Sequence, residues 1–358
     1  MKRVCLVDYD MAVTGGVEQV TASLANAFCG DYQVFLCEIN HSGPCAYDLD
    51  ERVHFQEGMK GKTRLREMIR GFLGPFIRFV KEHKIDVVLM MGNYPALIVS
   101  FTRFFTKARY IYCDHGALMN QWDQKDITGI RRWVSWCAHK TVVLTEKTRQ
   151  DYLEKFHIRP GKIRCIYNWV EDEVAESRRP YQRESRKILS VGRFGKEKGY
   201  DLLVKVAGQV LPEYPQWSWD IYGAGETFEE TKEAIRQAGL EGQICLKGNV
   251  KEAYRFYGEY AFLVLPSYRE GLPIVLLEAG ALGIPMVSFD IETGPGEIIL
   301  EGENGFLIPP YDVEGMAEKI RELIRDPDLR ERLASYEGTR EKFSKEKILR
   351  EWIKVLEE

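Results

Sequence analysis

Glu270 and Glu278 give the sequence its strongest chemical signal. Glu270 lies in a loop after a short apolar run, and Glu278 stands inside the apolar segment that follows. A helix is predicted to begin near residue 274, so the backbone amides of Leu272, Ile274 and Val275 should attract an anion. Two carboxylates beside an anion site can accept hydrogen bonds from sugar hydroxyls. The alternative is that Glu270 is only a charge at the helix start and Glu278 only a structural polar residue. A buried carboxylate needs hydrogen-bonding partners, however, which favours a role for Glu278 in ligand binding.

Arg193 and Lys198 form a second candidate site. They follow a predicted strand over Lys187–Val191 and share a glycine-rich loop. Because both cations leave the same strand end, both can reach one anion. A solvated charged loop is the alternative, and the position at a strand end favours phosphate binding.

Two glycine pairs add weaker signals. Gly15 and Gly16 follow the first predicted strand and open a helix, where missing side chains and free amides suit an anion. A plain strand-to-helix turn is an equally good interpretation. Gly223 and Gly225 follow another strand, but Phe228 replaces the third glycine of a dinucleotide fingerprint. We therefore interpret this second pair as a tight turn with amides near a phosphate.

His115 is the one histidine in a functional context. It follows a predicted strand of the first half of the chain. Ligands of parallel sheets bind beyond the carboxyl ends of the strands, so topology places this side chain at a binding edge. A structural histidine is the alternative.

These residues need elements that bring strand ends together, and the apolar pattern supplies them. Strands are predicted at residues 4–7, 34–37, 87–91, 110–113, 141–144, 163–166, 187–191, 218–222, 244–246, 262–265, 285–287 and 306–308. Helices are predicted at residues 17–28, 64–83, 96–105, 131–138, 146–156, 201–211, 229–238, 251–257, 274–282, 313–325 and 345–356. This alternation predicts an α/β protein with parallel sheets covered on both faces.

The pattern divides the chain into two doubly wound domains. Residues 1–170 form the first and residues 187–343 the second, and the polar segment 171–186 is predicted to link them. Residues 344–358 form a terminal helix that can pack back on the first domain. We expect the ligand site in a cleft between the domains.

Composition narrows the class of protein. The 358 residues are 45% hydrophobic and 29% charged, as in ordinary soluble proteins. No apolar run approaches the roughly 20 residues of a membrane span. The apolar stretch near residue 4 is also too short to form the core of a signal peptide. The eight cysteines form no C-x-x-C pair, which argues against zinc or redox sites and favours a reducing, cytoplasmic setting.

Charge is distributed unevenly. Residues 1–180 carry 26 Lys and Arg against 22 Asp and Glu, and the remainder carries 24 against 32. Neither half is basic enough to predict a nucleic-acid partner. Residues 59–84 combine eight Lys and Arg with an apolar face interrupted near Pro75, and residues 101–107 repeat that chemistry. Both segments could lie on an anionic membrane, or serve as ordinary domain elements.

Taken together, the sequence resembles the retaining glycosyltransferases of family 4, of the bacterial surface-polysaccharide type, over almost its whole length. The resemblance is carried by motifs in a fixed order: Gly15-Gly16-Val17-Glu18, His115, Gly192-Arg193 with Lys198-Gly199, Gly223-Ala224-Gly225, the Glu270/Glu278 pair, residues 281–285 and residues 302–308. It implies the GT-B fold, in which two Rossmann-like domains face a central cleft. The first domain would bind the acceptor and the second the nucleotide sugar.

The resemblance also implies roles for the residues. Arg193 and Lys198 would bind the donor diphosphate, Glu278 the ribose, and Glu270 the transferred sugar. The amides of Leu272, Ile274 and Val275 would touch phosphate or sugar. Gly15 and Gly16 would leave room for the diphosphate, Gly223 would lie near it, and His115 would lie near the reacting carbon.

The implied activity is transfer of a hexose or N-acetylhexosamine with retention, without a metal or other cofactor. The Thr-Gly-Pro-x-Glu form at residues 293–297 resembles members that use UDP-sugars. The implied acceptor is a saccharide, lipid-linked, which would place the protein in the cytoplasm or peripherally on the inner face of the cell membrane. A nucleotide-sugar epimerase and a non-catalytic nucleotide-sugar-binding protein are the alternatives, and a nicotinamide dehydrogenase is disfavoured.

Overall fold

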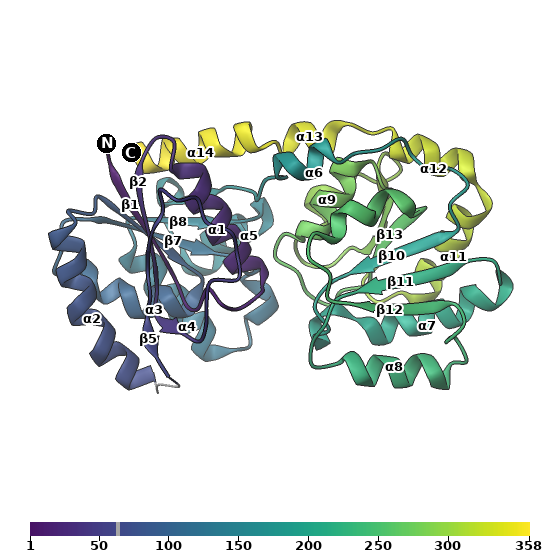
Figure 1. The fold of residues 1–358 in the computed structure, drawn as a ribbon, viewed down its shortest axis with the longest axis horizontal. Helices are drawn as coiled ribbons and strands as arrows, with labels where there is room; N and C mark the ends of the chain where they lie inside the picture. Colours follow the sequence, from purple (N-terminus) through teal and green to yellow (C-terminus); the bar gives the residue numbers. More distant parts are fainter. Residues whose placement is uncertain (62–64) are drawn as a thin grey trace. The chain divides into compact units, whose positions relative to one another are not determined.

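The computed structural model describes residues 1–61 and 65–358, and residues 62–64 lie outside the described part. The chain forms two compact units (Figure 1). The first comprises Met1–Tyr167 together with Leu349–Glu358, and the second comprises Asn168–Ile348. Each unit is a parallel β-sheet with helices on its faces, so the predicted α/β class is confirmed.

The first unit contains a seven-stranded sheet in the order β4-β2-β1-β6-β7-β8-β9, with parallel neighbours throughout. Its strands are β1 (Arg3–Asp8), β2 (Gln33–Glu38), β4 (His54–Gln56), β6 (Val87–Met91), β7 (Arg109–Asp114), β8 (Lys140–Val143) and β9 (Ile163–Cys165). A small parallel pair, β3 (Asn40–His41) and β5 (Met59–Lys60), lies outside it. The carboxyl ends of β1 and β7 therefore meet at one edge of the sheet.

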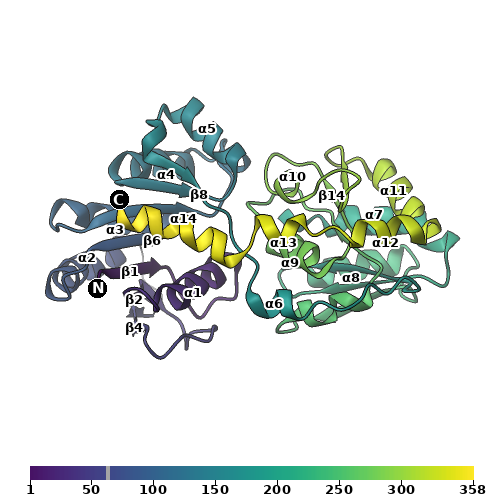
Figure 2. The same cartoon turned by 90° about the horizontal axis from the view of Figure 1, so that it is seen from above.

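Helices cover both faces of this sheet (Figure 2). They are α1 (Gly16–Phe28), α2 (Leu65–Glu82), α3 (Asn93–Ser100), η1 (Phe101–Phe104), η2 (Met119–Gln121), α4 (Lys125–Cys137), α5 (Glu146–Phe156) and η3 (Pro160–Lys162). The last turns of α14 (Lys345–Glu357) also belong here, since Trp352 is buried against the ring of Phe28 and Glu357 pairs with Lys2 at 2.7 Å.

The apolar face of helix α2 is buried, as expected for the ordinary domain element that was one of the two interpretations of residues 59–84. Met68, Phe72, Phe76 and Val80 recur every four residues and pack into the core of the first unit. The apolar face predicted to lie on a bilayer is thus already covered by protein. The helix also continues through Pro75 rather than breaking there, because these buried residues on both sides of the proline hold it against the sheet.

The second unit has a six-stranded parallel sheet in the order β12-β11-β10-β13-β14-β15. Its strands are β10 (Lys187–Val191), β11 (Ser218–Tyr222), β12 (Ile244–Gly248), β13 (Phe262–Leu265), β14 (Met286–Phe289) and β15 (Gly305–Ile308). Its helices are α6 (Asp172–Glu176), η4 (Lys196–Lys198), α7 (Tyr200–Val210), η5 (Leu211–Glu213), α8 (Phe228–Gln237), η6 (Ala253–Glu259), α9 (Ile274–Leu282), α10 (Pro295–Ile298), α11 (Val313–Arg325), α12 (Pro327–Ala334) and α13 (Gly338–Lys342). The order places β10 between β11 and β13, so the loops after these three strands are neighbours.

The segment 171–186 packs against the second unit instead of spanning open space. Val174 is buried in α6, and the hydroxyl of Tyr181 donates to the carbonyl oxygen of Ala261 at 2.7 Å. Arg330 donates to the carbonyl oxygen of Arg183 at 2.8 Å. These few contacts are dispersed among exposed charges, which explains why the polar composition alone suggested a linker.

No helix among the described residues is long and apolar enough to cross a membrane.

Candidate active site

Lys198 and Glu270 meet at the carboxyl ends of β10 and β13. The ammonium of Lys198 donates to Glu270 Oε1 at 2.7 Å, and the two side chains are 20% and 8% exposed. Lys198 ends the short helix η4, and Gly199 follows it with φ of +65°. A Cβ at Gly199 would stand 2.1 Å from the carbonyl oxygen of Pro266. Glycine therefore lets the Lys198 loop press against the loop that carries Glu270.

Three further contacts fix the loop of Glu270. The hydroxyl of Ser267 donates to Glu270 Oε1 at 2.7 Å, and the hydroxyl of Thr293 donates to the carbonyl oxygen of Glu270 at 2.8 Å. Gly294 lies close enough that an added Cβ would be 2.8 Å from the carbonyl oxygen of Gly271. The Thr-Gly-Pro segment predicted to bear on the donor thus packs directly on the Glu270 loop.

Arg193 lies in the same loop as Lys198 but has a different partner. Its guanidinium donates to Glu197 at 2.7 Å, and its side chain is 68% exposed. Burial opposes ionisation of Glu197, but the bond from Arg193 lowers the pKa of this carboxyl overall. The structure brings Lys198 to Glu270 and leaves Arg193 with its cationic end in solvent.

Glu278 is partly buried just over one turn into α9. Its carboxylate accepts a hydrogen bond from the hydroxyl of Tyr257 at 2.9 Å. Burial raises the pKa of Glu278 to about 7, and the bond from Tyr257 offsets only part of this effect. The group therefore changes between neutral and ionised forms near physiological pH.

The start of α9 has no side-chain cap. The cap residue Pro273 provides no side-chain hydrogen bond to the helix, and the first amides of any helix have no partner within it. Ile274 and Val275 occupy those first positions, while Leu272 is buried in the loop before them. Their amides carry the partial positive charge of the helix end.

Gly223 supports the Arg193 loop through its lack of a side chain. At φ of +146°, a Cβ here would lie 1.9 Å from the carbonyl oxygen of Gly192. The amide of Phe194 donates to the carbonyl oxygen of Ala224 at 2.9 Å, which joins the two loops. Gly223 is needed for this close packing at the end of β10 and β11.

In the first unit, Gly15 and Gly16 follow β1 and begin α1. The hydroxyl of Tyr47 accepts from the amide of Gly15 at 2.9 Å and donates to its carbonyl oxygen at 2.8 Å. Burial is the main cause that raises the pKa of Tyr47 to about 12. A Cβ at Gly16 would meet nothing within 4 Å among the described residues. Tyr47 clamps the first glycine, and the space at the second is open.

His115 follows β7 and sits beside a buried ion pair. Asp114 forms an ion pair with Arg131 at 2.9 Å, accepts a hydrogen bond from Arg131 Nη2 at 3.3 Å and accepts another from the hydroxyl of Tyr152 at 2.6 Å, so that carboxylate is occupied by structural partners. The Nε2 atom of His115 is buried and has no hydrogen-bond partner among the described residues. Burial lowers the pKa of His115 to about 4, against the opposing charge of Asp114. The imidazole is therefore neutral at physiological pH.

The predicted residues thus form two groups, which belong to different units. Lys198, Glu270 and the start of α9 lie together in the second unit, with Arg193 in the Lys198 loop and Glu278 in α9. His115 and the glycine pair lie at strand ends of the first.

Sequence reasoning missed three residues that hold these groups: Tyr47, Tyr257 and Ser267. A hydroxyl gives no sequence signal of its partner when that partner is distant in the chain. Ser267 is the exception, since it lies three residues before Glu270.

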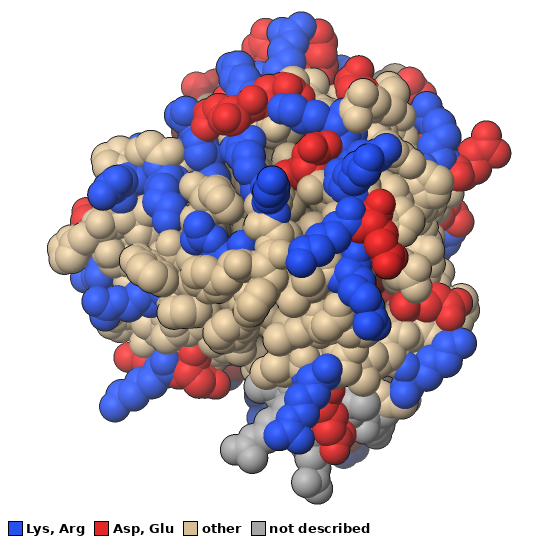
Figure 3. Space-filling model, turned by 90° about the vertical axis from the view of Figure 1, so that its left-hand side faces the viewer, with Lys and Arg blue, Asp and Glu red and all other residues tan. Residues whose placement is uncertain are grey.

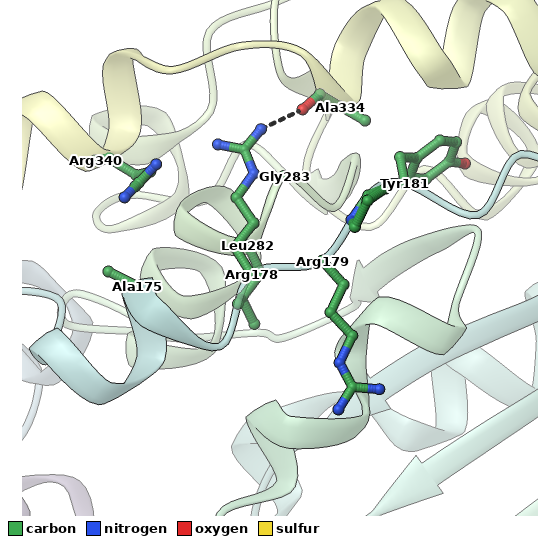
Figure 4. A pocket seen from close by; sticks show the side chains of 9 residues that line it. Ala175, Arg178, Arg179, Tyr181, Leu282, Gly283, Ala334 and Arg340 are labelled. Carbon is green, nitrogen blue, oxygen red and sulfur yellow. Dashed lines mark hydrogen bonds between the residues drawn. The ribbon is translucent and has the colours of Figure 1, made fainter.

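A separate pocket of the second unit contains several arginines (Figure 4). It has a volume of about 420 Å³ and is lined by Ala175, Arg178, Arg179, Pro180, Tyr181, Leu282, Gly283, Ala334 and Arg340. Arg178 turns toward the carbonyl oxygen of Ala334 and pairs with Glu337, whereas Arg179 points the other way. Because Glu337 also pairs with Arg340, two of the three arginines share this one carboxylate.

Comparison with known proteins identifies the family. Residues 14–174 match the model of Glycosyltransferase Family 4, and residues 173–340 match that of Glycosyl transferases group 1. The poly(ribitol-phosphate) alpha-N-acetylglucosaminyltransferase of Staphylococcus aureus is 31% identical, over 94% of this chain and 68% of that protein. The amylovoran biosynthesis glycosyltransferase AmsD of Erwinia amylovora is 26% identical over 99% of both chains.

The fold has solved counterparts. A mutant of S. aureus TarM, solved in complex with Fondaparinux, alpha-GlcNAc-glycerol and UDP, superposes with a TM-score of 0.84 over 100% of both chains at 18% identity. The chain belongs to the family 4 glycosyltransferases and has the GT-B fold, as its motifs predicted.

Proposed function

We propose that this glycosyltransferase moves a hexose or N-acetylhexosamine from a UDP-sugar to a lipid-linked saccharide, with retention of the anomeric configuration and without a metal. The product would contribute to a surface polysaccharide. The observation that carries the proposal is the Lys198–Glu270 contact in the loop before α9, a helix whose start has no side-chain cap. It places a cation and a carboxylate next to helix-start amides.

In this proposal the second unit holds the donor. Lys198, Arg193 and the amides of Ile274 and Val275 would oppose the negative charge that develops on the departing diphosphate. Fixed cations and dipoles of this kind are commonly the largest source of catalysis. Glu278 would accept hydrogen bonds from the ribose hydroxyls, and Glu270 from those of the sugar.

The family resemblance also gives roles to residues of the first unit. Gly16 would allow close approach of the diphosphate, and Tyr47 would keep the loop in place. The neutral His115, with its buried and unpaired Nε2, would offer a hydrogen bond to the sugar near the reacting carbon. These roles follow from the family resemblance and agree with the contacts of each residue within its own unit.

Two relatives support the choice of donor and acceptor. The S. aureus relative is named as an N-acetylglucosaminyltransferase, and the TarM structure contains UDP. A Campylobacter jejuni relative, 25% identical over 96% of this chain, is named as transferring N-acetylgalactosamine to a diphospho-undecaprenol saccharide. We extend a UDP-N-acetylhexosamine donor and a lipid-linked acceptor to this chain on that basis, with the cytoplasmic face of the membrane as its location.

The test is a panel of nucleotide sugars with and without lipid-linked acceptors, in buffer containing EDTA. We expect release of UDP that rises with acceptor, and an anomeric proton NMR signal that matches the configuration of the donor. Release of an epimerised nucleotide sugar without acceptor would replace transfer by epimerisation. An inverted product, or loss of activity with EDTA that added Mg²⁺ restores, would overturn the corresponding part of the proposal.

A further inference from the structure

Large aromatic side chains are exposed together on the first unit. Phe101, Phe104 and Phe105 are 37%, 59% and 61% exposed, and Trp136 is 67% exposed. Ring contacts join two of them through Trp133, whose ring centroid lies 5.6 Å from that of Phe101 and 5.7 Å from that of Trp136, while Phe104 and Phe105 follow Phe101 in the chain. We call these five residues the aromatic patch. Exposed apolar residues are ordinary when scattered singly, but a cluster marks an interaction surface.

Two cations contact the backbone at and beside Trp136. Arg103 donates to the carbonyl oxygen of Cys137, and Lys162 donates to those of Ser135 and Trp136 at 3.2 Å and 2.8 Å. Both cap the carboxyl end of α4, where cations are favoured by the helix dipole. The end of this helix therefore presents an aromatic ring next to positive charge.

Further cations surround the aromatic patch. Lys107, Arg132 and Arg159 are exposed, and none forms an ion pair with another described residue. Arg132 precedes Trp136 by one helical turn and so shares its face. Burial and then the nearby charges of Arg103 and Arg159 lower the pKa of Lys162, which reflects the crowding of positive charge.

The basic surface extends beyond the patch. Helix η1 packs against α2, whose residues Arg78 and Lys81 are exposed. Glu82 is an exposed acid of the same helix, and Glu358 pairs with Lys140 and Arg164. Figure 3 shows a face of the first unit on which Lys and Arg side chains are spread over uncharged surface, with several Asp and Glu side chains among them.

We propose that the aromatic patch docks the protein on an anionic lipid bilayer. Tryptophan and phenylalanine rings enter the boundary between headgroups and acyl chains, while the surrounding cations attract acidic headgroups. This inference deepens the proposed function, because it rests on a lipid-linked acceptor for its purpose. In this proposal the aromatic patch makes the contact with the membrane, and α2, whose apolar face is buried, does not.

Charge and composition favour a bilayer over other partners. In a symmetric contact with a second copy, the cations around one patch would face the same cations of the other, which is unfavourable without intervening anions. A glycan site would require carboxylate or amide side chains among the rings to bind hydroxyls. Three of the five patch residues are phenylalanines, and their charged neighbours are arginine and lysine.

The experiment is flotation of the full chain with vesicles of phosphatidylcholine alone or mixed with phosphatidylglycerol, at low and high salt. We expect binding only to the anionic vesicles, and weaker binding at high salt. A triple variant, Phe104→Ser, Phe105→Ser and Trp136→Ser, should bind at least roughly tenfold more weakly. In a second variant, Lys107→Glu and Arg132→Glu, removal of each cation should cost roughly fivefold.

Matched controls lie on the second unit. Leu300, which is 46% exposed, is changed to Ser, and Lys205 and Lys232 are changed to Glu, and neither change should alter flotation. Circular dichroism confirms that all variants fold. Unchanged flotation of both patch variants, or absence of wild-type binding to anionic vesicles at low salt, would overturn the proposal.

Two other outcomes would assign the patch to another partner. If light scattering shows that the triple variant converts an oligomer to a monomer without changing flotation, the partner is a second copy. If only retention on an anionic polysaccharide is lost, the partner is a glycan. Either result overturns docking on lipid. Vesicle binding needs no turnover, so intact flotation without UDP release from any donor would contradict the proposed function and leave the patch standing.

Discussion

The ionisation of Glu278 leads to a prediction about nucleotide binding. Burial raises the pKa of this carboxyl to about 7, compared with an ordinary value of 4.5. If the ionised form accepts hydrogen bonds from ribose, affinity for UDP must fall as Glu278 takes up a proton. With a pKa of about 7, the ionised fraction drops about tenfold between pH 8 and pH 6, so the dissociation constant should rise by about that factor.

The perturbation is Glu278→Gln, which keeps the shape of the side chain and an oxygen to accept from Tyr257. At pH 8 the loss of a charged acceptor should weaken UDP binding by about 10- to 100-fold, because hydrogen bonds to charged groups contribute about 1.5–3 kcal/mol. The variant should also lose the tenfold change between pH 8 and pH 6. Isothermal titration with UDP at several pH values measures both effects.

The same variant provides a control for the ligand. The phosphate of UDP takes up a proton in the same range, and this effect is common to wild type and variant, so only the difference between their pH profiles belongs to Glu278. Glu229→Gln, at an exposed position of α8, should leave the profile unchanged. An identical pH dependence in wild type and Glu278→Gln would refute the role of this carboxyl.

The contribution of Glu278 to folding stability should fall as pH rises, whereas the affinity for UDP should increase. Because the pKa of Glu278 is higher in the folded state, the folded protein holds an extra proton between pH 4.5 and pH 7. Stability from this group is therefore present at low pH and is lost as pH rises through that window. Thermal unfolding of Glu278→Gln should lack this part of the pH dependence.

Three further predictions concern other contacts. Lys198→Ala should lower the rate of UDP release by about 10²–10³, as for removal of one fixed donor to a developing negative charge, while circular dichroism stays unchanged; normal turnover would contradict its role. Tyr47→Phe should raise the donor KM by about 5- to 150-fold, since two hydrogen bonds of about 0.5–1.5 kcal/mol each hold Gly15, and an unchanged KM would show that the clamp does not matter. Asp114→Asn leaves the buried Arg131 without its charge partner and should destabilise the first unit by about 3–5 kcal/mol, seen as a lower melting temperature; a melting temperature equal to wild type would be inconsistent with this pair.

The strands of both sheets could be predicted because a parallel strand that is buried on both faces appears in the sequence as a short run of apolar residues. β6, β10, β11 and β13 have the predicted bounds. The edge strand β4 was missed, since its residues are mostly exposed and carry no apolar run. Edge strands are fixed by pairing with a neighbour, which composition does not reveal.

Helix α4 shows a different limit. It begins at Lys125, six residues before the predicted start, because its buried face includes Arg131 and Ser135. A buried arginine breaks the apolar period, and only its distant partner Asp114 makes that burial possible. Pairing between residues far apart in the chain is invisible to periodicity.

The candidate site was predicted in its residue types but not in its pairings. The sequence placed Arg193 and Lys198 together as equivalent cations. In the structure Lys198 binds Glu270, whereas Arg193 binds Glu197 and stays exposed. That difference depends on the close packing allowed by Gly199, a matter of backbone geometry at a single residue.

The central claim is that the loops after β10 and β13 bind the diphosphate and sugar of a nucleotide-sugar donor. The most direct measurement is UDP release from a panel of UDP-hexoses and UDP-N-acetylhexosamines by the wild type and by Lys198→Ala. The account predicts release from at least one donor by the wild type and a drop of about 10²–10³ in the folded variant. Equal release by both proteins, or no release from any donor with lipid-linked acceptors present, would contradict it.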